Sequence, residues 1–99
     1  MKAVIKRPGT SPKLIDIENT LEALQEAVGG YIECVAVADD VVICNEEGRL
    51  LMLPTNCKVW DVPYVGTILI VGTDGDNFTD VHDHDCWLYY LDLKENQWI

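Results

Sequence analysis

The C-terminal third of the chain contains a short cluster of side chains of the types that bind metal ions. On a helix, His82 and Cys86 would share one face, and Asp80 and His84 would share another. A single metal site would therefore receive only two ligands from this segment, and others would have to come from elsewhere, such as Cys57. The cluster is more typical of a solvated helix start, where acidic residues favour the helix dipole. We expect no metal ion and no other cofactor.

Nucleophilic catalysis needs a Ser or Cys side chain beside a His and an orienting carboxylate. The single serine, Ser11, falls in a predicted turn with no His near it in the sequence. Cys57 falls in a predicted loop, and nothing in the local sequence marks it as a stabilised thiolate. Gly29 and Gly30 end a predicted helix, whereas phosphate-binding loops begin one. We therefore expect no catalytic residues and no enzymatic activity.

The cysteine spacing and the hydropathy pattern indicate a cytoplasmic protein. No CxxC pair occurs, so neither a zinc ribbon nor a thioredoxin-type motif is indicated. We expect four reduced thiols at Cys34, Cys44, Cys57 and Cys86. No signal peptide precedes the first predicted strand, and no apolar run approaches the length of a membrane span.

The chain is strongly acidic, with seventeen Asp and Glu against seven Lys and Arg and a net charge of −10. Binding to nucleic acid through its phosphates needs clustered Lys and Arg, so we expect no direct nucleic-acid binding. A basic protein surface is the partner that this charge favours, because opposite charges accelerate the encounter.

The densest acidic segment is 74–85, where five Asp occur with no Lys or Arg among them. Acidic loops that only keep a small protein soluble are the simpler interpretation. The functional interpretation is a surface for a basic partner, to which exposed aromatic side chains add contact area. A homodimer interface would use the same features. The residues predicted to bind the partner are Asp74, Asp76, Asp80, Asp83, Asp85, Tyr89 and Trp98.

A second interpretation is a small-ligand site around the predicted loop 54–66. The rings of Trp60 and Tyr64 can stack on a base, which points to a nucleotide signal that the protein, in dimeric form, would sequester. The scarcity of cations counts against a polyphosphate. The residues predicted for this site are Asn45, Asn56, Lys58, Trp60 and Tyr64.

The element that organises the fold is a predicted helix at residues 20–28. Asn19 is its predicted N-cap, with Glu22 completing a capping arrangement, and Gly29 supplies a left-handed stop. The apolar residues that share one face of this helix are Leu21, Leu24 and Val28.

Predicted strands flank this helix on both sides. Residues 66–72 belong at the centre of a sheet, because their run of large apolar residues predicts burial on both faces. Residues 54–66 are predicted to be irregular, and residues 50–53 fit a short strand or a single helical turn. Residues 79–93 fit a helix capped by Thr79 better than a strand. The remaining predicted strands are residues 3–5, 13–17, 31–36 and 41–44.

These elements predict one α+β domain over residues 1–99, and the 48% hydrophobic content is enough for its core. We expect a mostly antiparallel sheet of four to five strands packed against one central helix, with a further helix at the C-terminus. The predicted order is β-β-α-β-β-(β)-β-α.

Several segments resemble a family of short proteins of unknown function carried by phages, plasmids and conjugative elements of Gram-positive bacteria. The matching segments are NTLE at 19–22, LQ at 24–25, VGGYIE at 28–33, CNEEG at 44–48, LP at 53–54 with Asn56, and GTILIVG at 66–72. These motifs are caps, turns and a core strand, so the resemblance implies no catalytic residue. It implies a mobile-element gene, for which an antagonist of host defence, acting by occupying a nucleic-acid-binding surface, is the natural role. The segment 81–86, VHDHDC, departs from the family pattern.

Overall fold

An antiparallel sheet forms the centre of the protein in the computed structural model, which describes residues 1–96. Its central strand is β7, and the predicted burial of this segment is confirmed, because all four residues from Ile68 to Val71 have no exposed surface. In spatial order the strands are β2 (Lys13–Asp16), β1 (Lys2–Lys6), β7 (Ile68–Asp74), β4 (Asp40–Asn45) and β3 (Ile32–Val37), with β8 (Asn77–Thr79) paired to β7.

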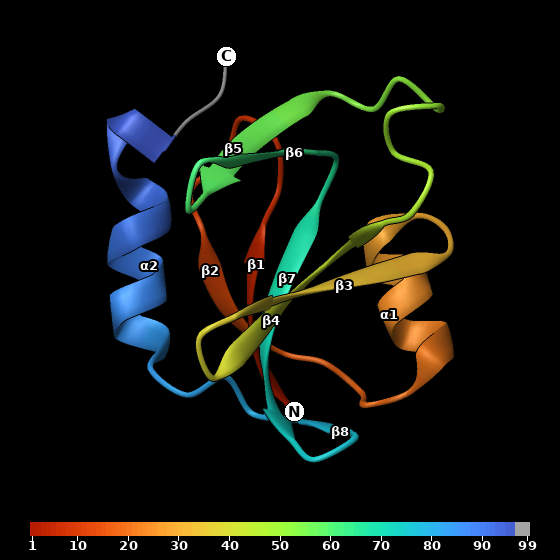
Figure 1. The fold of residues 1–99 in the computed structure, drawn as a ribbon, viewed down its shortest axis with the longest axis vertical. Coiled ribbons are helices and arrows are strands. Elements are labelled where there is room, and N and C mark those ends of the chain that lie inside the picture. The colour runs from red at the N-terminus through yellow and green to blue at the C-terminus, as the bar shows by residue number, and fades with distance from the viewer. Residues whose placement is uncertain (97–99) are drawn as a thin grey trace.

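Both faces of this sheet are covered, which gives the molecule three layers. Helix α1 (Leu21–Val28) lies on one face, and helix α2 (His84–Asp92) lies on the other together with the hairpin of β5 (Thr55–Val59) and β6 (Val62–Val65) (Figure 1). Side chains alternate between the faces along β7. Ile68 and Ile70 therefore share a core with α2 and the hairpin, whereas Leu69 and Val71 share one with α1. A 3-10 turn, η1 (Lys94–Asn96), follows α2.

Helix α1 ends as predicted but is capped differently at its start. The side chain of Thr20, not Asn19, accepts a hydrogen bond from the N–H of Ala23, and the Asn19 amide instead donates to the carbonyl of Phe78. Gly29 ends the helix with φ of 81°, as the left-handed stop requires. Leu21 was predicted to face the core but is 55% exposed, and the buried residues of this short helix are Leu24 and Val28.

The α+β class and the antiparallel sheet are confirmed, but the predicted order and the single central helix are wrong. Residues 1–96 form eight strands, and α1 covers one face of the sheet only. Residues 54–66 contain the β5–β6 hairpin where we expected an irregular loop. Residues 50–52 form a turn, and residue 53 lies outside any strand or helix.

The C-terminal helix is confirmed, although it begins later than predicted. Thr79 belongs to β8, and Asp83 caps α2 by accepting a hydrogen bond from the N–H of Cys86 at 3.1 Å. Trp87 and Leu91 turn inward to the core. Within residues 1–96, no helix is both long enough and apolar enough to cross a membrane.

Candidate functional site

A cleft lies where the β3–β4 turn, the β5–β6 turn and the start of α2 meet, and we call it the aromatic cleft. Its volume is about 290 Å³. Trp60 forms one wall at the tip of the β5–β6 hairpin, with 56% of its surface exposed. The residues that line the aromatic cleft are Ala38, Asp39, Asp40, Trp60, His82, Asp83, Cys86, Trp87 and Tyr90.

The turn that presents Trp60 has an unfavourable backbone conformation. Trp60 and Asp61 have φ of 49° and 65°, and together they form a two-residue hairpin loop between Val59 and Val62. Such loops favour Asn-Gly, because residues with larger side chains are strained at positive φ. A hydrogen bond of 2.8 Å from the Trp60 N–H to the Tyr90 hydroxyl helps to hold the turn against α2. The fold therefore keeps a large aromatic side chain exposed at the cleft despite this strain.

Asp40 is the polar centre of the aromatic cleft, and it is buried, with only 5% of its surface exposed. One carboxylate oxygen lies 2.5 Å from Nδ1 of His82 and accepts the main-chain N–H of the same residue at 3.3 Å. The other accepts Nε1–H of Trp87 at 2.8 Å. The hydrogen bond to the Asp40 carboxylate raises the pKa of His82. Asp40 thus fixes the ring of His82 while the rest of that imidazole faces solvent.

The predicted acidic residues are all exposed, and they occupy the β7–β8 turn and the start of α2. Asp74 and Asp76 flank Gly75 at the tip of the β7–β8 hairpin. Asp80 accepts the main-chain N–H of Lys2 at 2.7 Å, and Asp83 caps α2, so these two also stabilise the fold. The pairing of Asp40 with Gly72 brings the β3–β4 turn beside the β7–β8 hairpin, and of these acids Asp83 lines the aromatic cleft.

Two further residues were predicted to bind the partner together with these acids. Tyr89 lies on the outer side of α2 and is 71% exposed. Trp98 lies outside the described residues. Asp85 is in the first turn of α2, 3.3 Å from Nε2 of His84, and completes the acidic group.

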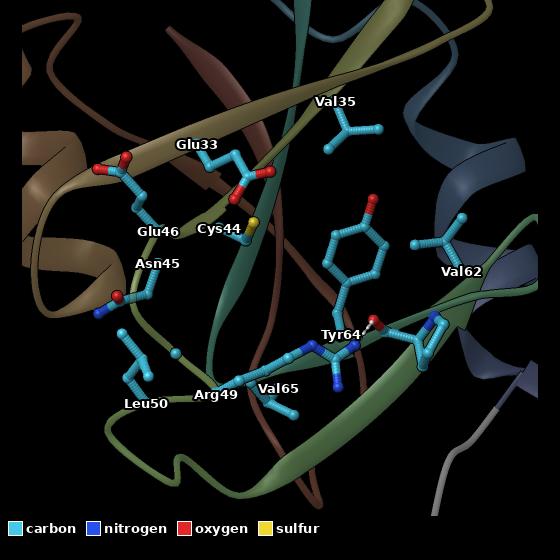
Figure 2. Close-up of a pocket in the computed structure, with 12 residues that line it drawn as sticks. Glu33, Val35, Cys44, Asn45, Glu46, Arg49, Leu50, Val62, Tyr64 and Val65 are labelled. Atoms are coloured by element: carbon cyan, nitrogen blue, oxygen red, sulfur yellow. Dashed lines mark hydrogen bonds between the residues drawn. The ribbon is translucent and has the colours of Figure 1, made fainter.

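A second cavity of about 230 Å³ lies between β3, β4, β6 and the segment that follows β4, and we call it the tyrosine cavity (Figure 2). Tyr64 rises from β6 with its hydroxyl directed toward β3, and the carboxylate of Glu33 extends toward it from the opposite wall. Arg49 donates to the carbonyl of Pro63 at 3.1 Å at the rim. The residues that line the tyrosine cavity are Glu33, Val35, Cys44, Asn45, Glu46, Gly48, Arg49, Leu50, Val62, Pro63, Tyr64 and Val65.

The residues predicted for a small-ligand site are divided between these places. Asn45 and Tyr64 line the tyrosine cavity, whereas Trp60 lines the aromatic cleft. Asn56 and Lys58 line neither. Asn56 is buried, and its amide donates to the carbonyls of Lys6 and Gly66, both at 2.7 Å, so it holds the hairpin to the sheet.

Within the described residues, the side chains considered for metal binding and catalysis do not come together in one site. Among residues 1–96 there is no group of three or more His, Cys, Asp or Glu side chains that could hold a metal ion. All four cysteines are free thiols, and Cys57, which was predicted to lie in a loop, is buried in β5. Burial raises the pKa of Cys57 to about 11 and that of Cys44 to about 11, so both remain protonated near neutral pH.

Sequence reasoning did not identify Asp40, Trp87, Tyr90 or Glu33 as site residues. Asp40 is the first residue of β4, directly before its apolar run. An acid at the end of a strand is usually exposed, so the local sequence gives no signal for the burial of this carboxylate. Its partners are more than forty residues away in the chain.

Comparison with known proteins identifies the family of this chain. Comparison with curated proteins and with solved structures found no match. A family model described as a domain of unknown function (DUF3846) matches residues 1–94, which includes the segment 81–86 that departs from the expected pattern. The chain therefore belongs to the DUF3846 family of domains of unknown function.

Proposed function

We propose that this protein is a non-catalytic binding module of a mobile genetic element, which engages a basic host protein through the aromatic cleft and the acids around it. The observation that carries the proposal is the exposed ring of Trp60 beside the carboxylates of Asp39 and Asp83. An aromatic wall with an acidic rim is suited to a Lys or Arg side chain of the partner. The mobile-element setting in a bacterial host rests on the family resemblance, and the proposed cytoplasmic location rests on the cysteine spacing and the hydropathy pattern.

The aromatic cleft supplies the short-range attraction. A guanidinium or ammonium group over the face of a Trp ring gains about 0.5–2 kcal/mol, the larger value where the contact is desolvated. Trp60 offers such a face, and Trp87 and Tyr90, whose rings are in edge-to-face contact, also line the cleft. Arg and aromatic residues dominate the energies of many protein interfaces, because their large side chains fill pockets.

The surrounding acids supply the long-range attraction. Asp74 and Asp76 at the β7–β8 hairpin and Asp85 at the start of α2 are exposed, and the whole chain carries a net charge of −10. Charge of this size accelerates the encounter with a basic partner and disfavours acidic ones. A basic surface that normally holds the phosphates of nucleic acid has the complementary charge, so occupying it would antagonise a host defence protein.

The binding role also accounts for the Asp40–His82 pair without catalysis. Asp40 bonds Trp87 and the main chain of His82 in addition to the imidazole, so it acts as a structural support of the cleft. Within residues 1–96 the side chain of His82 is hydrogen-bonded to Asp40 alone, and no hydroxyl or thiol is within hydrogen-bond reach of the imidazole.

A defined basic peptide tests the electrostatic part of the proposal. Binding of a fluorescent hexa-arginine peptide would be measured for the wild type, for Asp74→Asn/Asp76→Asn/Asp85→Asn, and for Glu18→Gln/Glu22→Gln/Glu26→Gln. The last variant loses the same charge around α1, on the other face of the sheet. We expect the Asp variant to bind about tenfold more weakly and the Glu variant to lose about twofold or less at low salt. Equal losses in the two variants would contradict a localised acidic site.

The contribution of Trp60 to binding is tested with the hexa-arginine peptide and with a hexa-citrulline peptide. Citrulline keeps the shape of the arginine side chain but lacks its charge. Trp60→Ala should weaken hexa-arginine binding about fivefold, and the citrulline peptide should not bind detectably. A pull-down from bacterial lysate at low and high salt would then identify basic partners. A genuine target has to be released by competing DNA or RNA, and a target indifferent to both would argue against antagonism of a nucleic-acid-binding surface.

A further inference from the structure

The hydroxyl group of Tyr64 is buried and has no hydrogen-bond partner within residues 1–96. Tyr64 is 6% exposed, and its hydroxyl is the one buried side-chain polar atom within residues 1–96 that lacks a partner. Native proteins seldom leave such a group unpaired, because it loses its bonds to water on burial. An unpaired buried hydroxyl at a cavity therefore indicates a position where another molecule supplies the missing bond.

The cavity around this hydroxyl has the form of a small binding site. Its volume of about 230 Å³ is somewhat below the usual range of ligand pockets, which suits a compact molecule of one ring. Figure 2 shows the Tyr64 hydroxyl between Glu33 on one side and Val62 on the other, with Val35 beyond it. Glu33 is exposed and Val62 is 45% exposed, so rotation of these rim side chains opens a path to the hydroxyl.

The lining determines the kind of molecule that fits. Burial raises the pKa of Tyr64 to about 12, so its hydroxyl keeps its proton and can donate to an acceptor on the ligand. The carboxylate of Glu33 can only accept, and therefore requires a donor on the ligand. Val35, Val62 and Val65 form apolar walls. Glu33 and Glu46 together outweigh Arg49, whose guanidinium is already bonded to Pro63, so anions are disfavoured.

We propose that the tyrosine cavity binds a small, uncharged, planar molecule in which an N–H donor adjoins a hydrogen-bond acceptor, as in a primary amide or the edge of a nucleobase. The acceptor receives the hydroxyl of Tyr64, and the N–H group donates to Glu33. This site is separate from the aromatic cleft and does not depend on the proposed protein partner. It retains Asn45 and Tyr64 from the ligand site predicted from the sequence, but excludes a nucleotide phosphate.

The test uses three probes that differ only in the polar group attached to the phenyl ring: benzamide, N,N-dimethylbenzamide and benzoate. The first has both donor and acceptor, the second lacks the donor, and the third carries a negative charge. Binding would be followed by chemical-shift changes in ¹⁵N-labelled protein. We expect benzamide to bind with a Kd of about 1–10 mM, as befits a fragment, with shifts centred on Glu33, Cys44 and Tyr64. The other two probes should bind at least about fivefold more weakly.

Two variants test whether benzamide binding depends on the buried hydroxyl of Tyr64. Tyr64→Phe should weaken benzamide binding at least about fivefold, while Tyr31→Phe, the same change at a tyrosine that is 65% exposed, should leave it unchanged. Cytosine and adenine, as one-ring and two-ring nucleobase probes, then show which size the cavity accepts. Any one of three results would overturn the proposal. These are equal binding of benzamide and N,N-dimethylbenzamide, binding of benzamide to Tyr64→Phe as tight as to the wild type, or no binding of any probe at about 20 mM.

Discussion

Asp40 and Trp87 are joined by a hydrogen bond of 2.8 Å between a buried carboxylate and the indole Nε1–H, and this bond ties β4 to α2. The two residues lie 47 positions apart in the chain and belong to different layers of the fold. The same carboxylate holds His82 at 2.5 Å. The shape of the aromatic cleft therefore depends on a single acidic side chain.

Replacing Asp40 with Ala should destabilise the protein by about 2–4 kcal/mol. The substitution leaves the indole N–H of Trp87 buried without an acceptor and releases His82, and both effects act on the folded state. Urea unfolding followed by tryptophan fluorescence measures the loss. Asp39→Ala, at the exposed neighbouring residue, should change stability by less than about 0.5 kcal/mol. Similar values for the two variants would show that the Asp40 contacts contribute little.

The Asp40–His82 pair should make stability depend on pH. The pKa of His82 is raised in the folded protein by its hydrogen bond to Asp40. The charged form is therefore favoured by folding, so this contribution is fully present below the unfolded pKa of 6.5 and is lost as the pH rises through the higher folded value. The wild type should exceed His82→Asn in unfolding free energy by more at about pH 5.5 than at about pH 8.5. A difference that is constant, or that grows with pH, would contradict the pairing.

The sequence predicted the fold correctly where the residues of a single segment determine the conformation of that segment. The run of large apolar residues between Gly66 and Gly72 predicted the central strand, because no other arrangement buries both of its faces. The β5–β6 hairpin was missed for two local reasons. Pro63 interrupts the second strand and is tolerated only because β6 belongs to a two-stranded sheet, and the turn has Trp60 and Asp61 where Asn-Gly is usual.

The candidate site was predictable only in part, because its residues come from segments that the sequence does not connect. The acids from Asp74 to Asp85 were apparent as a run, and they remain exposed in the structure. The burial of Asp40 depends on contacts with α2, and the packing of Tyr64 against β3 and β4 depends on the missed hairpin. Neither follows from composition or periodicity, since both are products of layer packing.

Asn56 should be among the most sensitive positions of the fold. Its amide donates to the carbonyls of Lys6 and Gly66 and accepts Nζ of Lys6 at 3.1 Å, and burial of that ammonium lowers the pKa of Lys6. Asn56→Ala leaves two carbonyls and a buried cation with fewer partners, so we expect a loss of about 3 kcal/mol in urea unfolding. Asn77→Ala, at an exposed site in β8, is the matched control and should be nearly neutral.

Gly72 should not accept a side chain, for steric reasons. It pairs with Asp40 on one side and Thr79 on the other, and a Cβ atom there would overlap the carbonyl oxygen of Asp80 and lie 3.1 Å from Cε1 of His82. Gly72→Ala should therefore cost about 2–3 kcal/mol and alter the NMR signals of the His82 ring. Thr73→Ala, one position along the strand, should have a much smaller effect. A normal spectrum and unchanged stability for Gly72→Ala would show that the crossing chain moves aside freely.

Tyr64→Phe should leave the free protein at least as stable as the wild type, and should raise its unfolding free energy by up to about 1 kcal/mol. The substitution keeps the packed ring and removes a buried hydroxyl that has no partner, so folding no longer strips water from that group. Thermal and urea unfolding measure the change, with Tyr31→Phe as the exposed control. A loss of more than about 1 kcal/mol would mean that the hydroxyl is satisfied in solution, by water or by Glu33, and so needs no ligand. A gain in stability combined with weaker benzamide binding is the result expected of a group retained for binding at the expense of stability.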